Sequence, residues 1–476
     1  MIKRIIFLLV FAITVAIFCI ERFYLSRVHS STTVVSDLSA IRKRGKLIAV
    51  TNINSTDYFI FRGETMGFNY ELLKSFSDNI GIDLEVVTEN HIDKAINMLN
   101  SGAADLLAFN LAVNPAMEQE LTLSAPICET RQVLIQRKPR DWKSLSDKDI
   151  EKKMIRNPKD LVRKTIYVQA GSTHAEQLFP FAKEIRDSIN VIEVPFGSEK
   201  LIQHVADGEI DYSICDENIA SVVAANYPGI DVNTTVSFPH NTAWGLRKER
   251  SDTLKNELNR WINSYRKTES FALLYAKYFR NSSSGNIVKS DYYSVNTGKV
   301  SQYDDIIRKF SSFINWDWRL LASLICQESH FNPKVESITG AVGLMQVMPV
   351  TGKYFGIDVT SSPENNIKAG IEYINWLHSI FDPRIPDEKE RISFILAAYN
   401  AGPGHVLDAM NLAAKNGMDP LKWDGSVALW LAKKSDPKYY NDIVVKNGYF
   451  KGIESVAFVS QILDRYEHYK NLIPRH

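Results

Sequence analysis

The chain has 476 residues, which is too long for a single hydrophobic core and suits two or more domains. Lys and Arg number 56 against 55 for Asp and Glu, so the net charge gives no sign of a nucleic-acid partner. The apolar share of 45% is ordinary for a globular protein.

The first residues have the character of an export segment. Lys3 and Arg4 precede an apolar run over residues 5–20, which Glu21 ends. This order predicts a signal peptide or an N-terminal anchor within residues 1–25. The run is short for a membrane-spanning helix, which needs about 20 apolar residues. The sequence leaves the choice between a cleaved and a retained segment open.

The four cysteines, at positions 19, 128, 215 and 326, are not spaced as metal ligands. No nucleotide motif appears either, so we expect no metal and no cofactor. Cys19 does not fit a lipoprotein signal, because Phe18 stands where a small residue is expected. Cys326 lies in an apolar helical pattern and is predicted to be a core residue. The sequence does not decide whether Cys128 and Cys215 form a disulfide.

From residue 41 onward, short apolar strands alternate with amphipathic helices. Strands are expected at residues 46–50, 83–87, 105–109, 165–169, 190–194 and 211–215. The alternation predicts an α/β arrangement with parallel strands. Because the pattern restarts at Thr165, we expect two similar lobes with a ligand cleft between them, over residues 40–280.

Four motifs in this half resemble the periplasmic solute-binding proteins of the polar amino-acid type. They are Gly67-Phe68 through Leu72, Ser124-Ala125-Pro126, Gly171-Ser172-Thr173, and Gly208 through Asp216. The resemblance implies that Asp216 holds the ammonium group of a ligand. The alternative for Asp216 is a solvated strand end or a helix cap.

Three further residues are candidates for contacts with this ligand. Ser172 and Thr173 stand at a predicted helix start, where backbone amides suit an anion or a carboxylate. Tyr58 follows the first strand and has an aromatic ring suited to stacking on a ligand, with core packing as its alternative.

One departure from that family bears on the ligand. The segment that carries an arginine in the family reads Asn114-Pro115-Ala116-Met117 here, so the arginine is absent. Methionine cannot give the paired hydrogen bonds of a guanidinium to a carboxylate. We therefore expect a larger ligand than a free amino acid, such as a cell-wall stem peptide or muropeptide.

The junction follows a predicted helix over residues 261–279. Residues 281–286, NSSSGN, have the composition of a linker, and we place the linker at 281–302. Residues 303–476 then form a second, mainly helical domain. Its helices are expected at 304–313, 316–329, 367–380, 388–399, 405–416 and 452–469.

Glu328 is the candidate catalytic residue of the second domain. It lies four residues after Leu324 and seven after Leu321, so it shares their apolar helix face. Burial of a carboxylate raises its pKa and makes it a candidate general acid. The alternative is a solvated Glu at a helix end. Pro333 breaks the helix just afterwards, and a Gly-rich loop follows.

Three ordered motifs resemble the soluble lytic transglycosylase family, which has a goose-type lysozyme-like fold. They are Glu328-Ser329 followed by Ser337, GLMQ at 343–346, and AYNAGPG at 398–404. The resemblance implies that Ser337 supports the sugar ring or the acid, and that Met345 and Gln346 line the groove. It also implies that Tyr399 and Asn400 orient the acid and the sugar. Packing for Tyr399 and turn capping for Asn400 are the alternatives.

Glu454 lies at the start of the last predicted helix. The family places a glutamate near the beginning of a late helix, where it helps to hold the site, and Glu454 matches that position in the order of motifs. The alternative is a first-turn glutamate that the helix dipole favours.

The predicted fold class is an α/β two-lobed periplasmic-binding-protein-like domain followed by a mainly α, lysozyme-like domain. The resemblance implies an exported enzyme that cuts peptidoglycan glycan strands between N-acetylmuramic acid and N-acetylglucosamine and leaves a 1,6-anhydro end. A single carboxylate fits this route, since glycoside hydrolases usually need two. The first domain would sense a ligand and regulate the second.

Two alternative functions stay open, a lysozyme-type hydrolase and a peptidoglycan-binding receptor without activity. The resemblance further implies membrane association at the periplasmic face of the outer membrane.

Overall fold

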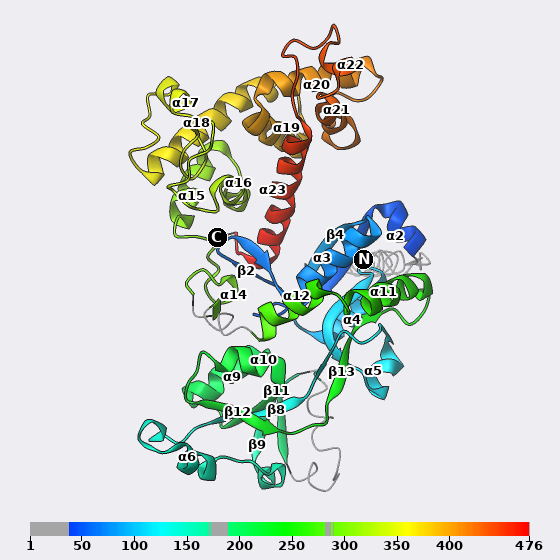
Figure 1. The fold of residues 1–476 in the computed structure, drawn as a ribbon, viewed down its shortest axis with the longest axis vertical. Helices are drawn as coiled ribbons and strands as arrows, with labels where there is room; N and C mark the ends of the chain where they lie inside the picture. The colour runs from blue at the N-terminus through cyan, green and yellow to red at the C-terminus, as the bar shows by residue number, and fades with distance from the viewer. Residues whose placement is uncertain (1–37, 171, 173–188, 281–286, 289, 476) are drawn as a thin grey trace, which may run out of the picture.

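The computed structural model describes residues 38–170, 172, 189–280, 287–288 and 290–475. In these residues the first half carries two large sheets with flanking helices and a small two-stranded sheet, and the second half is built of helices (Figure 1). The predicted fold class is confirmed. The apolar segment at residues 5–20 lies outside the described residues. Within them, no helix has both the length and the apolar character needed to cross a membrane.

The first lobe is built on a sheet with the strand order β4-β1-β5-β13-β6, to which β7 adds by pairing with β13. β1, β4 and β5 are parallel, whereas β13 runs antiparallel to β5. Its elements are β1 (Lys46–Thr51), β4 (Asp83–Thr88), β5 (Leu106–Ala112), β6 (Thr122–Leu123), β7 (Cys128–Thr130), β13 (His240–Leu246), α2 (Leu38–Arg44), α3 (Phe68–Ile80), α4 (Ile92–Ser101) and α5 (Pro115–Glu120). β5 is buried along almost its whole length, as expected of a central parallel strand with both faces covered.

The second lobe has the strand order β10-β9-β11-β8-β12. Its elements are β8 (Gln132–Arg137), β9 (Thr165–Gln169), β10 (Asn190–Val194), β11 (Tyr212–Asp216), β12 (Ile230–Thr235), α6 (Asp147–Lys153), α9 (Ser198–Asp207) and α10 (Glu217–Ala224). The chain crosses between the lobes from β7 to β8 and returns from β12 to β13. Each crossing supplies one antiparallel strand to an otherwise parallel group.

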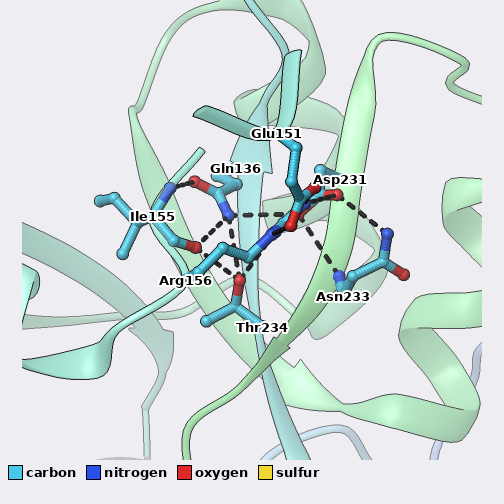
Figure 2. A network of polar contacts seen from close by, with 7 residues as sticks. All are labelled: Gln136, Glu151, Ile155, Arg156, Asp231, Asn233 and Thr234. Atoms are coloured by element: carbon cyan, nitrogen blue, oxygen red, sulfur yellow. Dashed lines mark hydrogen bonds and ion pairs between the residues drawn. The ribbon is translucent and has the colours of Figure 1, made fainter. Parts of the chain in front are cut away.

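A polar network fastens the connection after α6 to the edge of the second sheet (Figure 2). Arg156 forms ion pairs with Glu151 and with the buried Asp231, the latter at 2.6 Å. Gln136 exchanges two hydrogen bonds with the backbone of Ile155, each 3.0 Å long, as a neighbouring strand would. The network therefore ties the segment after α6 to side chains of β8 and β12.

The predicted helix over residues 261–279 is wrong as a single element. The structure has α11 (Asp252–Tyr265) and α12 (Glu269–Phe279) instead. Thr268 causes the break, because its hydroxyl accepts a hydrogen bond from the Phe271 amide and caps a new helix. The three cysteines in the described residues are buried and free, so Cys128 and Cys215 do not form a disulfide.

The second half is organised around α16, which packs against α15 and α23. The helices are α15 (Asp304–Ser311), α16 (Trp318–Ser329), α17 (Pro349–Tyr354), α18 (Pro363–Phe381), α19 (Glu388–Ala401), α20 (Pro403–Lys415), α21 (Ala428–Lys433), α22 (Pro437–Tyr440) and α23 (Ile453–Leu472). α16 is buried from Trp318 to Cys326, so it is a core helix whose last turn alone reaches the surface. Asp317 caps its start by accepting from the Arg319 amide at 3.0 Å.

A small hairpin of the first half contacts the second half directly. It consists of β2 (Phe59–Phe61) and β3 (Glu64–Met66), and lies against the lower end of α23 in Figure 1. The Tyr469 hydroxyl of α23 donates to the Gly63 carbonyl at the hairpin turn, at 2.6 Å. Part of the predicted linker also joins it, since α14 (Ser294–Thr297) begins with a serine whose hydroxyl accepts from the Ile60 amide.

Candidate active site

Glu328 lies in the last turn of α16, where the helix emerges from the core. The helix ends at His330, which has a left-handed backbone conformation with φ 48°. The Glu328 side chain is half-buried, and it makes no hydrogen bond or ion pair with any described residue. Burial raises the pKa of its carboxyl to about 8. The group is therefore largely protonated near neutral pH, as a general acid must be.

The loop that follows α16 is fastened to the helix beside this acid. Ser329 donates to the Leu344 carbonyl at 2.8 Å. Asn366 of α18 accepts from the Met345 amide at 2.9 Å and donates to the Val342 carbonyl, also at 2.9 Å. Gly343 is required here, because its φ is +78° and a Cβ would lie 2.4 Å from the Asn366 side chain.

Tyr399, near the end of α19, completes this arrangement. Its hydroxyl donates to the Met345 carbonyl at 2.7 Å. Burial, followed by the nearby charge of Glu328, raises the pKa of Tyr399 well above its usual range. The phenol is therefore a stable donor close to the acid. The next residue, Asn400, accepts a hydrogen bond of 2.6 Å from the Ser455 hydroxyl of α23.

The structure places the other predicted residues of this site in different surroundings. Ser337 and Gln346 lie in the loop, where Ser337 accepts from the Ala341 amide and Gln346 donates to the Val335 carbonyl. The prediction that the Met345 side chain lines the groove is wrong, because it is fully buried against Gly370. Its carbonyl is the group that contacts the site residue Tyr399.

Glu454 is not brought to this arrangement by any contact in the described residues. Its side chain is exposed and forms an ion pair with Lys451, as the first-turn alternative predicts. The neighbouring Ser455 makes the contact with Asn400 instead. Asn366 and Ser455 were not predicted from the sequence, because nothing local marks either as a partner of the motifs.

The first half contains a cleft of about 350 Å³ between its two lobes. Asp216 and Ser172 line this cleft, and Thr173 lies outside the described residues. Asp216 stands at the start of α10 but its side chain does not cap the helix. It lies 3.9 Å from the imidazole of His240. Its side chain is therefore directed at the cleft rather than used as a helix cap.

Tyr58 does not line the cleft, and the prediction of a ligand contact is wrong. Its side chain is fully buried, and its hydroxyl lies 2.7 Å from Nδ1 of His468 on α23. The Tyr70 ring also packs edge to face against the same imidazole, with ring centroids 4.9 Å apart. Tyr58 is a contact between the two halves.

Acidic and amide side chains dominate the polar lining of the cleft. Burial raises the pKa of Asp57 to about 6, although Asn54 and Asn110 donate to its carboxylate. Glu199, on the second lobe, accepts from Ser55 of the first lobe and from Tyr293 of the predicted linker. The Ser55–Glu199 hydrogen bond therefore links the two lobes across the cleft. The carboxyl groups in the lining favour a ligand that carries a cationic group.

Comparisons with known proteins agree with this division of the chain. Residues 48–281 match the family described as "Bacterial extracellular solute-binding proteins, family 3", and residues 305–421 match the "Transglycosylase SLT domain". A "Membrane-bound lytic murein transglycosylase F" of Desulfosudis oleivorans is 32% identical over 91% of this chain and 92% of its own. The chain belongs to the membrane-bound lytic murein transglycosylase F family.

Other relatives in this family match at similar length. The one from Pseudomonas putida is 29% identical over 91% of this chain and 86% of its own. Among solved structures, an ancestral arginine-binding protein bound to arginine covers 50% of this chain and 99% of its own, at 22% identity and a TM-score of 0.42.

Proposed function

We propose that Glu328 is the single catalytic acid and base of a lytic transglycosylase that cuts peptidoglycan. The observation that carries the proposal is a half-buried carboxyl, with a pKa of about 8, at the exposed end of a core helix. A protonated acid in this position can protonate a glycosidic oxygen at neutral pH.

In the first step, the Glu328 proton goes to the oxygen that links N-acetylmuramic acid to N-acetylglucosamine, and the bond from that oxygen to C1 breaks. The muramic ring is left with positive charge, which the new carboxylate stabilises. In the second step, the carboxylate takes the proton of the C6 hydroxyl as its oxygen bonds to C1. The 1,6-anhydro ring closes, water is not consumed, and Glu328 regains its proton.

The surrounding groups have positioning roles in this proposal. Tyr399 fixes the Met345 carbonyl at 2.7 Å and so sets the position of the loop against the acid. Ser337 and Gln346 contact the sugar from that loop. Asn400, held by Ser455, orients the substrate from the end of α19. The desolvated surroundings keep Glu328 protonated until the substrate arrives.

The test is a digest of purified sacculi with products identified by mass spectrometry. The parent chain is expected to release anhydromuropeptides, and Glu328→Gln is expected to release none. The matched control is Glu388→Gln, an exposed glutamate at the start of α19, which is expected to keep parent activity. Products one water heavier would indicate a lysozyme-type hydrolase, and no products from the parent would favour a receptor.

We also propose that residues 40–280 form a sensing domain, joined by residues 281–302 to a catalytic domain at 303–476. Asp216 would bind the ammonium group of a stem peptide or muropeptide in the cleft, which has no arginine in its described lining. Asp216→Asn is expected to weaken calorimetric binding of muropeptides and leave basal digestion unchanged. Asp211→Asn, an exposed neighbour on the chain, is the control.

We place the protein at the periplasmic face of the outer membrane, exported through its N-terminal segment. The family name supports membrane attachment. Fractionation of cells producing the chain, followed by immunoblotting, is expected to find it with outer-membrane markers. Recovery with inner-membrane markers would instead indicate a retained anchor at residues 5–20.

A further inference from the structure

The β2–β3 hairpin and the end of α16 bring together a third group of reactive side chains, separate from the acid and from the cleft. The Glu64 carboxylate, the Cys326 thiol and the His330 imidazole each direct one donor atom at the others, all within 4.8 Å. Glu64 Oε1 lies 3.4 Å from Cys326 Sγ and 2.8 Å from His330 Nδ1. Two halves of the chain contribute, because Glu64 and Cys326 are 262 residues apart.

We propose that these three residues bind a divalent transition-metal ion of the zinc class, which joins the hairpin to the last turn of α16. Thiolate, imidazole and carboxylate are the three ligand types that proteins use for zinc. With metal–ligand bonds of about 2.0–2.3 Å, neighbouring ligand atoms of a tetrahedral site are separated by about 3.3–3.7 Å. The Glu64–Cys326 separation already has this value, and His330 has to withdraw by about half an ångström.

The charges of the three ligands also fit an ion of charge two. A thiolate and a carboxylate carry two negative charges, so the bound ion would leave a neutral group in a partly buried place. Cys326 lies in the last turns of α16 and His330 at its C-terminal end, and each brings a donor atom to the Glu64 carboxylate.

The site is held in place by contacts that do not depend on a metal. The Gly63 carbonyl at the hairpin turn accepts from the Tyr469 hydroxyl at 2.6 Å. Gly63 has φ +84°, and a Cβ there would lie 2.4 Å from the Phe331 ring, so the turn fits closely against the second half. Because the ligand side chains are already close together, metal binding loses little side-chain conformational entropy.

An ion can reach the site from solvent. The His330 and Glu64 side chains are 70% and 45% exposed, whereas Cys326 lies beneath them and is fully buried. The exposed side leaves room for a water molecule as a fourth ligand. Burial raises the pKa of the Cys326 thiol to about 12, while the nearby positive charge of Arg465 lowers it. A metal ion would displace the thiol proton on binding.

The experiment is a titration of the full chain, purified without a histidine tag and stripped of metal with a chelator, using Co²⁺ as the probe. We expect one Co²⁺ per chain and a thiolate-to-cobalt charge-transfer band in the ultraviolet. Cys326→Ala is expected to lose the band, and Cys128→Ala, at another buried free cysteine, is the control that keeps it. Absence of the band in the parent would overturn the proposal.

Two surface variants keep the test decisive if Cys326→Ala does not fold. Glu64→Gln and His330→Gln are each expected to weaken Zn²⁺ binding at least tenfold, as measured by calorimetry. Their circular dichroism spectra are expected to match that of the parent. His91→Gln, an exposed histidine at the start of α4, is expected to bind Zn²⁺ as the parent does. Unchanged affinity in both Glu64→Gln and His330→Gln would show that the three residues form only a hydrogen-bonded group.

Discussion

Substitution of Glu328 by Gln is expected to have two effects: it abolishes catalysis and it stabilises the folded protein. The carboxyl has a pKa of about 8 in the folded chain against an ordinary value of 4.5, so the folded state holds its proton more tightly than the unfolded state. Below pH 4.5 the carboxyl is protonated in both the folded and the unfolded state, so it does not lower the free energy of unfolding. Above pH 8 the folded state must contain a desolvated charge. The parent therefore loses stability between pH 4.5 and 8, and the neutral amide does not.

The magnitude follows from the two pKa values. Their difference, at about 1.4 kcal/mol for each pH unit, gives a penalty of about 5 kcal/mol above pH 8. Partial exposure of Glu328 makes this an upper value. For a helical unit of this size the penalty corresponds to about 10–20 °C in melting temperature.

The assay is scanning calorimetry of the full chain at a series of pH values between 4 and 9. The melting temperature of Glu328→Gln minus that of the parent should be near zero at pH 4, should grow through neutral pH and should level off above pH 8. Glu467→Gln, an exposed glutamate paired with Lys470, should show no such growth. A difference that is the same at every pH would refute the claim that burial of this carboxyl sets its pKa.

Three further substitutions test the contacts around the site and between the halves. Tyr399→Phe leaves the Met345 carbonyl without its donor, so we expect a loss of about 1–3 kcal/mol in stability and about tenfold in sacculus digestion; unchanged activity would mean that Tyr399 only packs. Arg156→Leu leaves the buried Asp231 unpaired, and we expect about 3 kcal/mol of destabilisation at pH 7. Because Arg156 holds the pKa of Asp231 below its usual range, this loss should shrink as the pH falls toward 3. Gly63→Ala, whose Cβ would meet Phe331, should raise amide hydrogen exchange in β3 and the last turn of α16, whereas Gly45→Ala, with open space around it, should not.

The sequence was sufficient for elements whose signals are local. The apolar spacing before Glu328 placed α16 within two residues of its observed start and at its observed end. The same pattern identified Glu328 as an acid on a buried face, and burial does raise its pKa. It failed at Thr268, where a single cap divides a continuous apolar pattern into two helices. Periodicity reports which face is buried, but a cap acts through one hydrogen bond.

Contacts across long sequence distances could not be predicted in this way. Tyr58 appeared suited to a ligand because it follows a strand, yet its partner His468 is 410 residues away. Met345 was assigned to the groove because it belongs to the GLMQ motif. A sequence motif does not reveal whether a residue contacts the site through its side chain or through its carbonyl. In both cases the deciding neighbour lies on another helix, and a single sequence carries no record of that pairing.

The last turn of α16 can serve both the acid and the proposed metal site, because their side chains leave the helix in different directions. Successive residues in a helix are rotated by about 100°, so Glu328 points about 200° away from Cys326. The face with Cys326 and His330 meets the hairpin of the first half. Glu328 instead lies near Tyr399, whose pKa is raised by burial and then by the charge of Glu328. Contacts on the hairpin side can therefore hold the helix end without occupying the side where the glycan would bind.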